Sequence, residues 1–126
     1  MAKKLLEPFE QSLASLKEIF VPVANSEILR DAIILRFQYS IEMSWKVAKK
    51  IIEEQGLEAD SPKNVMRVLA KMNMIESAEP WIDFINARNL IVHTYNQMTA
   101  QEVFSKVPLF VELAEKLLLK FKQLNE

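Results

Sequence analysis

The sequence contains no cysteine, a single glycine and a single histidine among its 126 residues. The absence of cysteine excludes disulfide bonds, thiolate catalysis and cysteine-ligated metal sites, and it fits a cytoplasmic protein. One glycine and five prolines leave few residues for tight hairpin turns, so a β-sheet is not expected. A lone histidine provides no ligand cluster for zinc within the chain, so we expect no metal site and no other cofactor.

The chain also lacks long apolar runs and a strong excess of one charge. No stretch approaches the roughly 20 apolar residues that cross a membrane, and Met1–Glu7 lacks the apolar core of a signal peptide, so no membrane association is expected. The formal net charge is −1, so any contact with RNA must come from a local patch. Length and composition predict one all-α domain over residues 1–126.

Helical periodicity predicts five helical segments. They run from Lys3 to Phe20, from Glu27 to Gln55, onward from Ser61-Pro62, from Pro80-Trp81 into residues 88–96, and from Thr99 to Leu124. Ser26 and Ser61 are expected to act as N-caps, and Thr99–Glu102 reads as a capping box that starts the last helix. Gly56 is expected to stop the second helix, and Pro108 to kink or break the fifth.

The segment from Glu27 to Gln55 is expected to be the centre of the bundle. Its apolar stripe consists of Ile33, Phe37, Ser40, Ile41, Ser44, Val47, Ala48 and Ile51. Ile34, Leu35 and Trp45 widen the apolar arc beyond that of a simple surface helix. A helix with so wide an arc either lies in the core of its domain or meets another subunit, and the pattern leaves both open.

Residues 88–96 combine the only histidine with an arginine at a position where the helical pattern requires an apolar side chain. One stripe contains Trp81, Phe84, Ile85, Arg88, Val92 and Tyr95. A guanidinium in an apolar stripe keeps its charge and therefore needs a carboxylate, carbonyl groups or a phosphate. Because the capping box requires the preceding helix to have ended, we expect His93 in or just beyond the last turn. A snorkelling or ion-paired arginine and a surface histidine are the simpler interpretations.

The order of these residues resembles the HEPN family. Arg88, His93 and Tyr95 follow the R-x4-H-x-Y signature of bacterial HEPN proteins. Further residues, in order over about residues 5–124, are similar to the subfamily of nucleotidyltransferase substrate-binding proteins; they are Arg30-Asp31, Arg36-Phe37, Glu42, Trp45-Lys46, Gly56, Ser61-Pro62, Trp81, Asn89, Thr94 and Asn96. Gln38 departs from the pattern, because related sequences often carry glutamate there. If that carboxylate positions the arginine, either Asp31 or Glu42 must replace it in this chain, or this member is weakened as an enzyme.

The resemblance implies a HEPN-like, up-and-down bundle of four to five mainly antiparallel helices. It also implies a homodimer that works with a small nucleotidyltransferase encoded beside it, often as a toxin–antitoxin pair. The HEPN member is then a metal-independent ribonuclease, with Arg88 and His93 catalytic and with Asn89, Asp31 and Glu42 in support. The partner silences it by adding adenylate to the motif tyrosine, which is Tyr95 here. The subfamily name implies an alternative, in which the chain is a passive subunit that holds a nucleotide or another substrate for the transferase.

The chemistry of the residues leads to the same hypotheses. RNA cleavage without a metal needs a proton acceptor, a proton donor and a cation for the phosphate. His93 can serve as acid or base near neutral pH, and Arg88 can clamp two phosphate oxygens. Since each chain has one histidine, a two-histidine mechanism requires a C2 dimer. An RNase toxin, a non-catalytic transferase partner and an interaction bundle therefore remain open; the lack of a basic stripe favours the second, and the Arg-His-Tyr cluster counts against the third.

Overall fold

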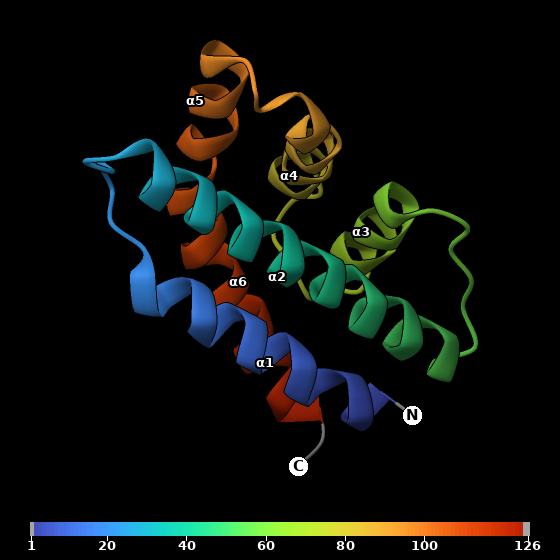
Figure 1. Ribbon diagram of the computed structural model, residues 1–126. Helices are drawn as coiled ribbons and strands as arrows, with labels where there is room; N and C mark the ends of the chain where they lie inside the picture. Colours follow the sequence, from blue (N-terminus) through green and yellow to red (C-terminus); the bar gives the residue numbers. More distant parts are fainter. Residues whose placement is uncertain (1, 125–126) are drawn as a thin grey trace.

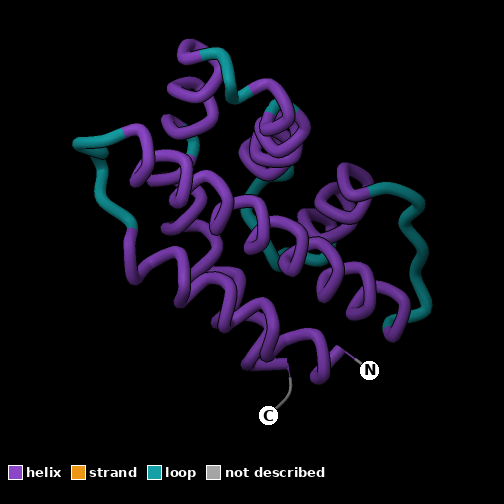
Figure 2. The backbone as a smooth tube through the Cα atoms, viewed as in Figure 1, coloured by secondary structure: helices purple, strands orange, loops and turns teal. Residues whose placement is uncertain are grey.

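The computed structural model describes the backbone of residues 2–124 and the side chains of residues 4–124. Over that range the chain forms six α-helices and one 3₁₀-helix, with no strand (Figures 1 and 2). The helices are α1 (Ala2–Ile19), α2 (Glu27–Glu54), α3 (Pro62–Lys71), α4 (Glu79–Asn89), η1 (Ile91–His93), α5 (Gln97–Ser105) and α6 (Val107–Leu124). The predicted all-α bundle is confirmed, while Met1 and Asn125-Glu126, the ends of the predicted domain, lie outside the described residues.

The helix signals at both ends of α2 and at the start of α3 act as the sequence indicates. The Ser26 hydroxyl accepts the amide of Leu29 at 3.1 Å, and the Ser61 hydroxyl accepts the amide of Asn64 at 3.2 Å. Gly56 adopts a φ of 78° just beyond α2, a left-handed conformation that glycine adopts without a steric penalty. The helix ends at Glu54, one residue before the predicted limit.

The predicted start of the last helix at Thr99 is wrong. Helix α5 begins at Gln97, and the Asn96 side chain caps it by accepting the amides of Met98 at 2.9 Å and Thr99 at 3.2 Å. Asparagine is the stronger N-cap of the two residue types, so Thr99 lies inside the first turn instead of ahead of it. The predicted break is confirmed, because α5 ends at Ser105 and Pro108 occupies the first turn of α6, where its missing N–H is harmless.

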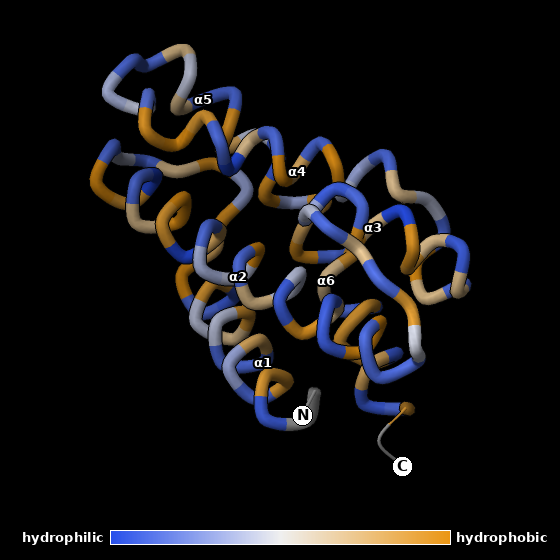
Figure 3. Tube along the Cα trace, turned by 90° about the vertical axis from the view of Figure 1, so that its right-hand side faces the viewer, coloured by the Kyte–Doolittle hydropathy of each residue, from blue (hydrophilic) through white to orange (hydrophobic). Residues whose placement is uncertain are grey.

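Helix α2 crosses the middle of the bundle, with α1 along one side, α3 and α4 along the other and α6 behind it (Figure 1). Every residue of its predicted stripe is buried. Of the residues that widen the arc, Ile34 is buried and Trp45 half-buried, but Leu35 is exposed. One face of α2 therefore lies in the core and another lies on the outer surface. Each helix in Figure 3 likewise alternates between hydrophobic and hydrophilic segments.

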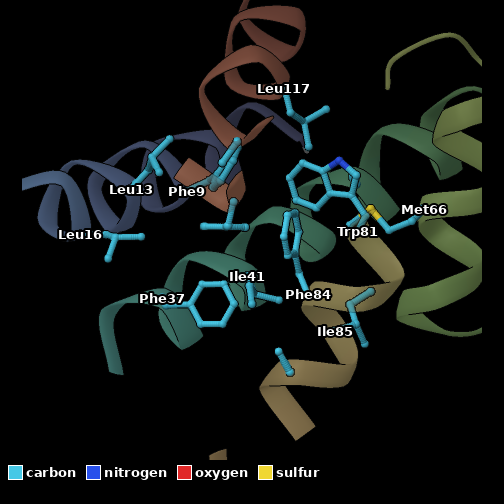
Figure 4. Close-up of a cluster of buried hydrophobic side chains, with 14 of the residues drawn as sticks. Phe9, Leu13, Leu16, Phe37, Ile41, Met66, Trp81, Phe84, Ile85 and Leu117 are labelled. Atoms are coloured by element: carbon cyan, nitrogen blue, oxygen red, sulfur yellow. The ribbon is translucent and has the colours of Figure 1, made fainter. Parts of the chain in front are cut away.

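Aromatic side chains hold α4 and α6 against α2. The ring of Phe110 meets Phe37 at a centroid distance of 5.1 Å and Phe84 at 5.3 Å, both edge to face. Trp81 contacts Phe84 at 5.5 Å and Phe110 at 5.8 Å, and Figure 4 shows Trp81 and Phe84 beside the α2 residues. Edge-to-face pairs add about 0.5–1.5 kcal/mol each beyond their burial. The cluster therefore fixes where α4 ends relative to α2, which decides the geometry of the candidate site.

The first and last long helices pack side by side, so the two described ends of the chain lie at one end of the bundle. Phe9 of α1 and Phe121 of α6 meet at 6.1 Å between ring centroids, and Lys17 pairs with Glu115 at 2.6 Å. The connection between α4 and α5 lies at the opposite end (Figure 1). Within the described range, none of the helices is both long and apolar enough to span a membrane.

Candidate functional site

The candidate site is built on the connection between α4 and α5. Helix α4 ends at Asn89, and η1 follows as a single 3₁₀ turn that ends at His93. The amide of His93 donates to the Leu90 carbonyl at 2.9 Å, and the amide of Asn96 donates to the His93 carbonyl at 3.1 Å. This confirms that His93 lies just beyond the last turn of the preceding helix, in a stretch whose β-branched residues disfavour α-helix.

The predicted apolar stripe does not extend past Arg88. Trp81, Phe84 and Ile85 are buried, but Val92 is 76% exposed and Tyr95 is 83% exposed. The α-helical period ends with the helix itself, so a count by helical spacing no longer applies after Asn89. The consequence is that the histidine and the tyrosine lie on the surface, open to solvent.

Arg88 is paired with Glu42 of α2. Its Nε lies 2.8 Å from Oε1 of Glu42, and 27% and 25% of the two side chains are exposed. The N–H is not directed along the line between these atoms, so the contact is an ion pair without an aligned hydrogen bond. Glu42 lies four residues after Gln38 on the same face of α2, so it supplies a carboxylate one turn further along.

Of the other predicted site residues, His93, Tyr95 and Asn89 are exposed near the end of α4, whereas Asp31 has a different partner. His93 and Tyr95 lie together, with ring centroids 6.2 Å apart and planes at 69°, and both are exposed. Asn89 is exposed as the last residue of α4. Asp31, the other candidate partner of Arg88, instead contacts Arg30 with its Oδ1 at 3.2 Å from Nη2. Among the described residues, no group of three or more acidic or histidine side chains is arranged to hold a metal ion.

Arg30 belongs to the quoted family pattern, but that pattern gave it no role and did not identify it as a buried arginine. Only 5% of Arg30 is exposed, and its Nη1 donates to Oε1 of Gln97 at 2.6 Å. A signal was present, because Arg30 precedes Ile33 by three residues and so extends the apolar stripe of α2 by one turn. The anomaly is the same as at Arg88, a guanidinium on a core stripe.

Residues 4–123 match the family described as "Nucleotidyltransferase substrate binding protein like". The chain belongs to this family. A protein from Haemophilus influenzae named "Probable ribonuclease HepT" is 23% identical, and the match spans 100% of this chain and 98% of that protein. The predicted relationship to HEPN and nucleotidyltransferase substrate-binding proteins is therefore confirmed.

Two solved structures share the fold of this family member. A crystal structure from Thermus thermophilus is 37% identical with a TM-score of 0.81, and the match covers 87% of this chain and 95% of that one. A tri-AMPylated HEPN toxin from Shewanella oneidensis, in complex with an MNT antitoxin, is 19% identical with a TM-score of 0.77, over 97% and 96% of the two chains. Because the sequence identity to the S. oneidensis toxin is 19%, this second comparison shows a shared fold and nothing more.

In this chain, Glu42→Gln is expected to lower the free energy of unfolding by about 1–2 kcal/mol. Removing one member of a fully buried ion pair costs about 3–5 kcal/mol, and solvent screening reduces that loss here because both side chains are partly exposed. Urea unfolding monitored by circular dichroism measures the change. The control is Glu18→Gln, because Glu18 is 77% exposed and lies 3.8 Å from Arg36. Equal losses in the two variants would contradict a specific role for Glu42.

Proposed function

We propose that this chain is a HEPN toxin-type, metal-independent endoribonuclease that acts at the seam of a homodimer in the cytoplasm. The proposal takes residues 1–126 as one HEPN-like domain and assigns catalysis to Arg88 and His93, with Tyr95 modified by a cognate nucleotidyltransferase. The observation that carries it is a guanidinium anchored at the end of α4 by Glu42, followed by an exposed imidazole in contact with an exposed phenol ring. The name of the H. influenzae relative supports the reaction class.

The proposed reaction needs two proton transfers around one phosphate. One imidazole removes the 2′-hydroxyl proton, the 2′-oxygen attacks the adjacent phosphorus, and the bond from phosphorus to the 5′-oxygen breaks. The second imidazole, from the other protomer, gives a proton to the leaving 5′-oxygen. Arg88, positioned by Glu42, stabilises the charge that develops on the non-bridging phosphate oxygens, and Asn89 supports binding at the edge of the site, whereas Asp31, paired with Arg30, takes no part.

The proposed dimer seam follows from exposed apolar side chains around the site. They are Ile28, Leu35 and Tyr39 on α2, Val92 and Tyr95 on the connection, and Met98 on α5. The pairs Glu42–Arg88 and Arg30–Gln97 hold these elements side by side, so the apolar residues surround the candidate site. Exposed apolar surface of this kind is typical of a subunit interface.

Sedimentation at micromolar concentration is expected to give about twice the chain mass of 14.6 kDa. Leu35→Glu is expected to dissociate the dimer, because a carboxylate at the seam would lose its hydration without a partner. Leu119→Glu is the matched control, since Leu119 is exposed on α6, away from the seam. A monomeric wild-type chain would remove the shared-site mechanism.

The proposed activity is tested by incubating the purified chain with labelled RNA in the presence of a chelator. We expect cleavage that leaves a 2′,3′-cyclic phosphate and a 5′-hydroxyl, and we expect it to persist without divalent metal. Intact RNA, together with binding of nucleotide or of the transferase, would favour the second candidate function.

That second candidate is a non-catalytic subunit that binds a nucleotide or another substrate for a nucleotidyltransferase. The family description supports it, and so does the net charge of −1, which provides no general attraction to RNA. The carboxylate of Glu42 beside Arg88 also reduces the local positive charge available to a phosphate. Calorimetric titration of the chain with ATP, alone and with the transferase, separates this function from catalysis.

A further inference from the structure

The segment that carries His93 and Tyr95 is tied to α2 at both of its ends. At the first end, Arg88 pairs with Glu42. At the second end, Gln97 contacts two side chains of the first turn of α2. Between these ties, the hydrogen bonds of residues 90–96 are local, such as the bond from the Thr94 hydroxyl to the Ile91 carbonyl at 2.8 Å. Leu90 and Ile91 also pack against the core, whereas Val92, His93 and Tyr95 are exposed, so the second tie helps to set the position of the segment after Ile91.

The second tie fixes the Gln97 amide from both sides. Its Oε1 accepts from Nη1 of Arg30 at 2.6 Å, and its Nε2 donates to Oε1 of Glu27 at 2.9 Å. The amide cannot turn over without placing two donors or two acceptors against each other. Gln97 is also the first residue of α5, directly after the Asn96 cap, so fixing this amide fixes the start of the helix.

Arg30 is the buried member of this arrangement. Its side chain is 6% exposed, whereas its carboxylate partner Asp31 is 59% exposed and is its immediate neighbour in sequence. Burying a guanidinium is costly, and a solvated carboxylate compensates for that cost only in part. The shortest contact of Arg30 is with the neutral amide of Gln97. The buried guanidinium therefore contributes more to the orientation of α5 than to charge balance.

Helix α5 has nine residues, fewer than an isolated helix requires for stability in water, and the side chains that it buries, Ala100, Val103 and Phe104, all lie beyond its first three residues. We propose that Arg30 is a positioning residue, which acts through Gln97 to hold the start of α5 and thereby the segment that presents His93 and Tyr95. Its importance for catalysis rests on the proposed function. Its effect on the position of His93 does not, and can be measured without RNA.

An exchange of two side chains tests this tie without removing the buried arginine. Gln97→Glu is expected to break the contact with Glu27, because it replaces the donor with a second carboxylate, and the repulsion should displace the start of α5 although the new carboxylate can still accept from Arg30. Adding Glu27→Gln should restore the contact, because the new amide at position 27 donates to the new carboxylate at position 97, which still accepts from Arg30. Gln101→Glu is the control, since Gln101 lies one turn further along α5 and is exposed.

The single histidine makes the readout specific. The imidazole C–H signals in a proton NMR spectrum come from His93 alone, because the chain has no other histidine. In Gln97→Glu we expect these signals to shift or broaden, and amide hydrogen exchange of residues 93–97 to become about tenfold faster. The double variant should return both measurements to wild-type values, and Gln101→Glu should leave them unchanged.

Two results would overturn the proposal: unchanged His93 signals and exchange in Gln97→Glu, or a double variant that stays as perturbed as the single one. If the wild-type chain cleaves RNA, Gln97→Glu should lower kcat about tenfold with little change in KM, and the double variant should recover it. If the wild-type chain leaves RNA intact, the proposed function fails, while the NMR and exchange data still decide whether the contacts of Gln97 with Arg30 and Glu27 position the segment.

Discussion

Replacing His93 with alanine is expected to lower the rate of RNA cleavage by about 10²–10⁴-fold, the usual contribution of a general acid or base. Each chain has one histidine, so a homodimer of the variant loses both imidazoles at once. A loss of this size should also remove the growth defect that expression of the wild-type chain is expected to cause. Cleavage of labelled RNA and growth curves after induction measure the two effects.

The fold of the variant should be intact, because the His93 side chain is exposed, and circular dichroism checks this. Asn86→Ala is a matched control on an exposed position of α4. Arg88→Ala should abolish cleavage as well, and Arg88→Lys should restore little of it, because an ammonium cannot form the bidentate clamp on a phosphate. Cleavage that survives His93→Ala would show that the proposed mechanism is wrong even if the activity is right.

Replacing Tyr95 with phenylalanine is expected to prevent modification by the cognate transferase. In the proposed reaction the phenol oxygen attacks the α-phosphorus of ATP and pyrophosphate leaves, so adenylate is transferred to the hydroxyl. The added negative charge and bulk would then occupy the phosphate site of the RNA. Phenylalanine removes the hydroxyl and keeps the ring that meets His93. Incubation with the transferase and ATP, followed by mass spectrometry, measures the product.

Tyr39→Phe provides the control, because Tyr39 is the only other tyrosine and 53% of it is exposed. This variant should gain mass as the wild-type chain does. A modification that persists in Tyr95→Phe would assign the acceptor to another residue.

The sequence was sufficient for the helices whose signals are local. Each long helix buries one face, so residues such as Ile33 and Phe37 recur at helical spacing, and Ser26 and Ser61 cap the helices that follow them. The identity of the acid beside Arg88 could be narrowed to two residues but not decided. That decision required the packing of α4 against α2, which local sequence does not encode.

The sequence was insufficient where two local signals compete. Asn96 and Thr99 are both good caps three residues apart, and the start of α5 is fixed by Asn96 together with the contact between Gln97 and Arg30. Helical spacing also placed Val92 and Tyr95 on the core stripe, because periodicity alone does not show that the helix ends at Asn89. Both errors fall in the connection that carries the candidate site.

The pairing of α1 with α6 has a consequence for the surface that carries Tyr95. Both described chain ends lie at the far end of the bundle from η1 and α5 (Figure 1). Helix α2 runs between these two ends of the bundle, and its 28 residues extend about 40 Å. The surface that carries His93 and Tyr95 therefore lies about the length of α2 away from the pairing of α1 with α6, so a conservative substitution at Phe9 or Phe121 should leave that surface unchanged.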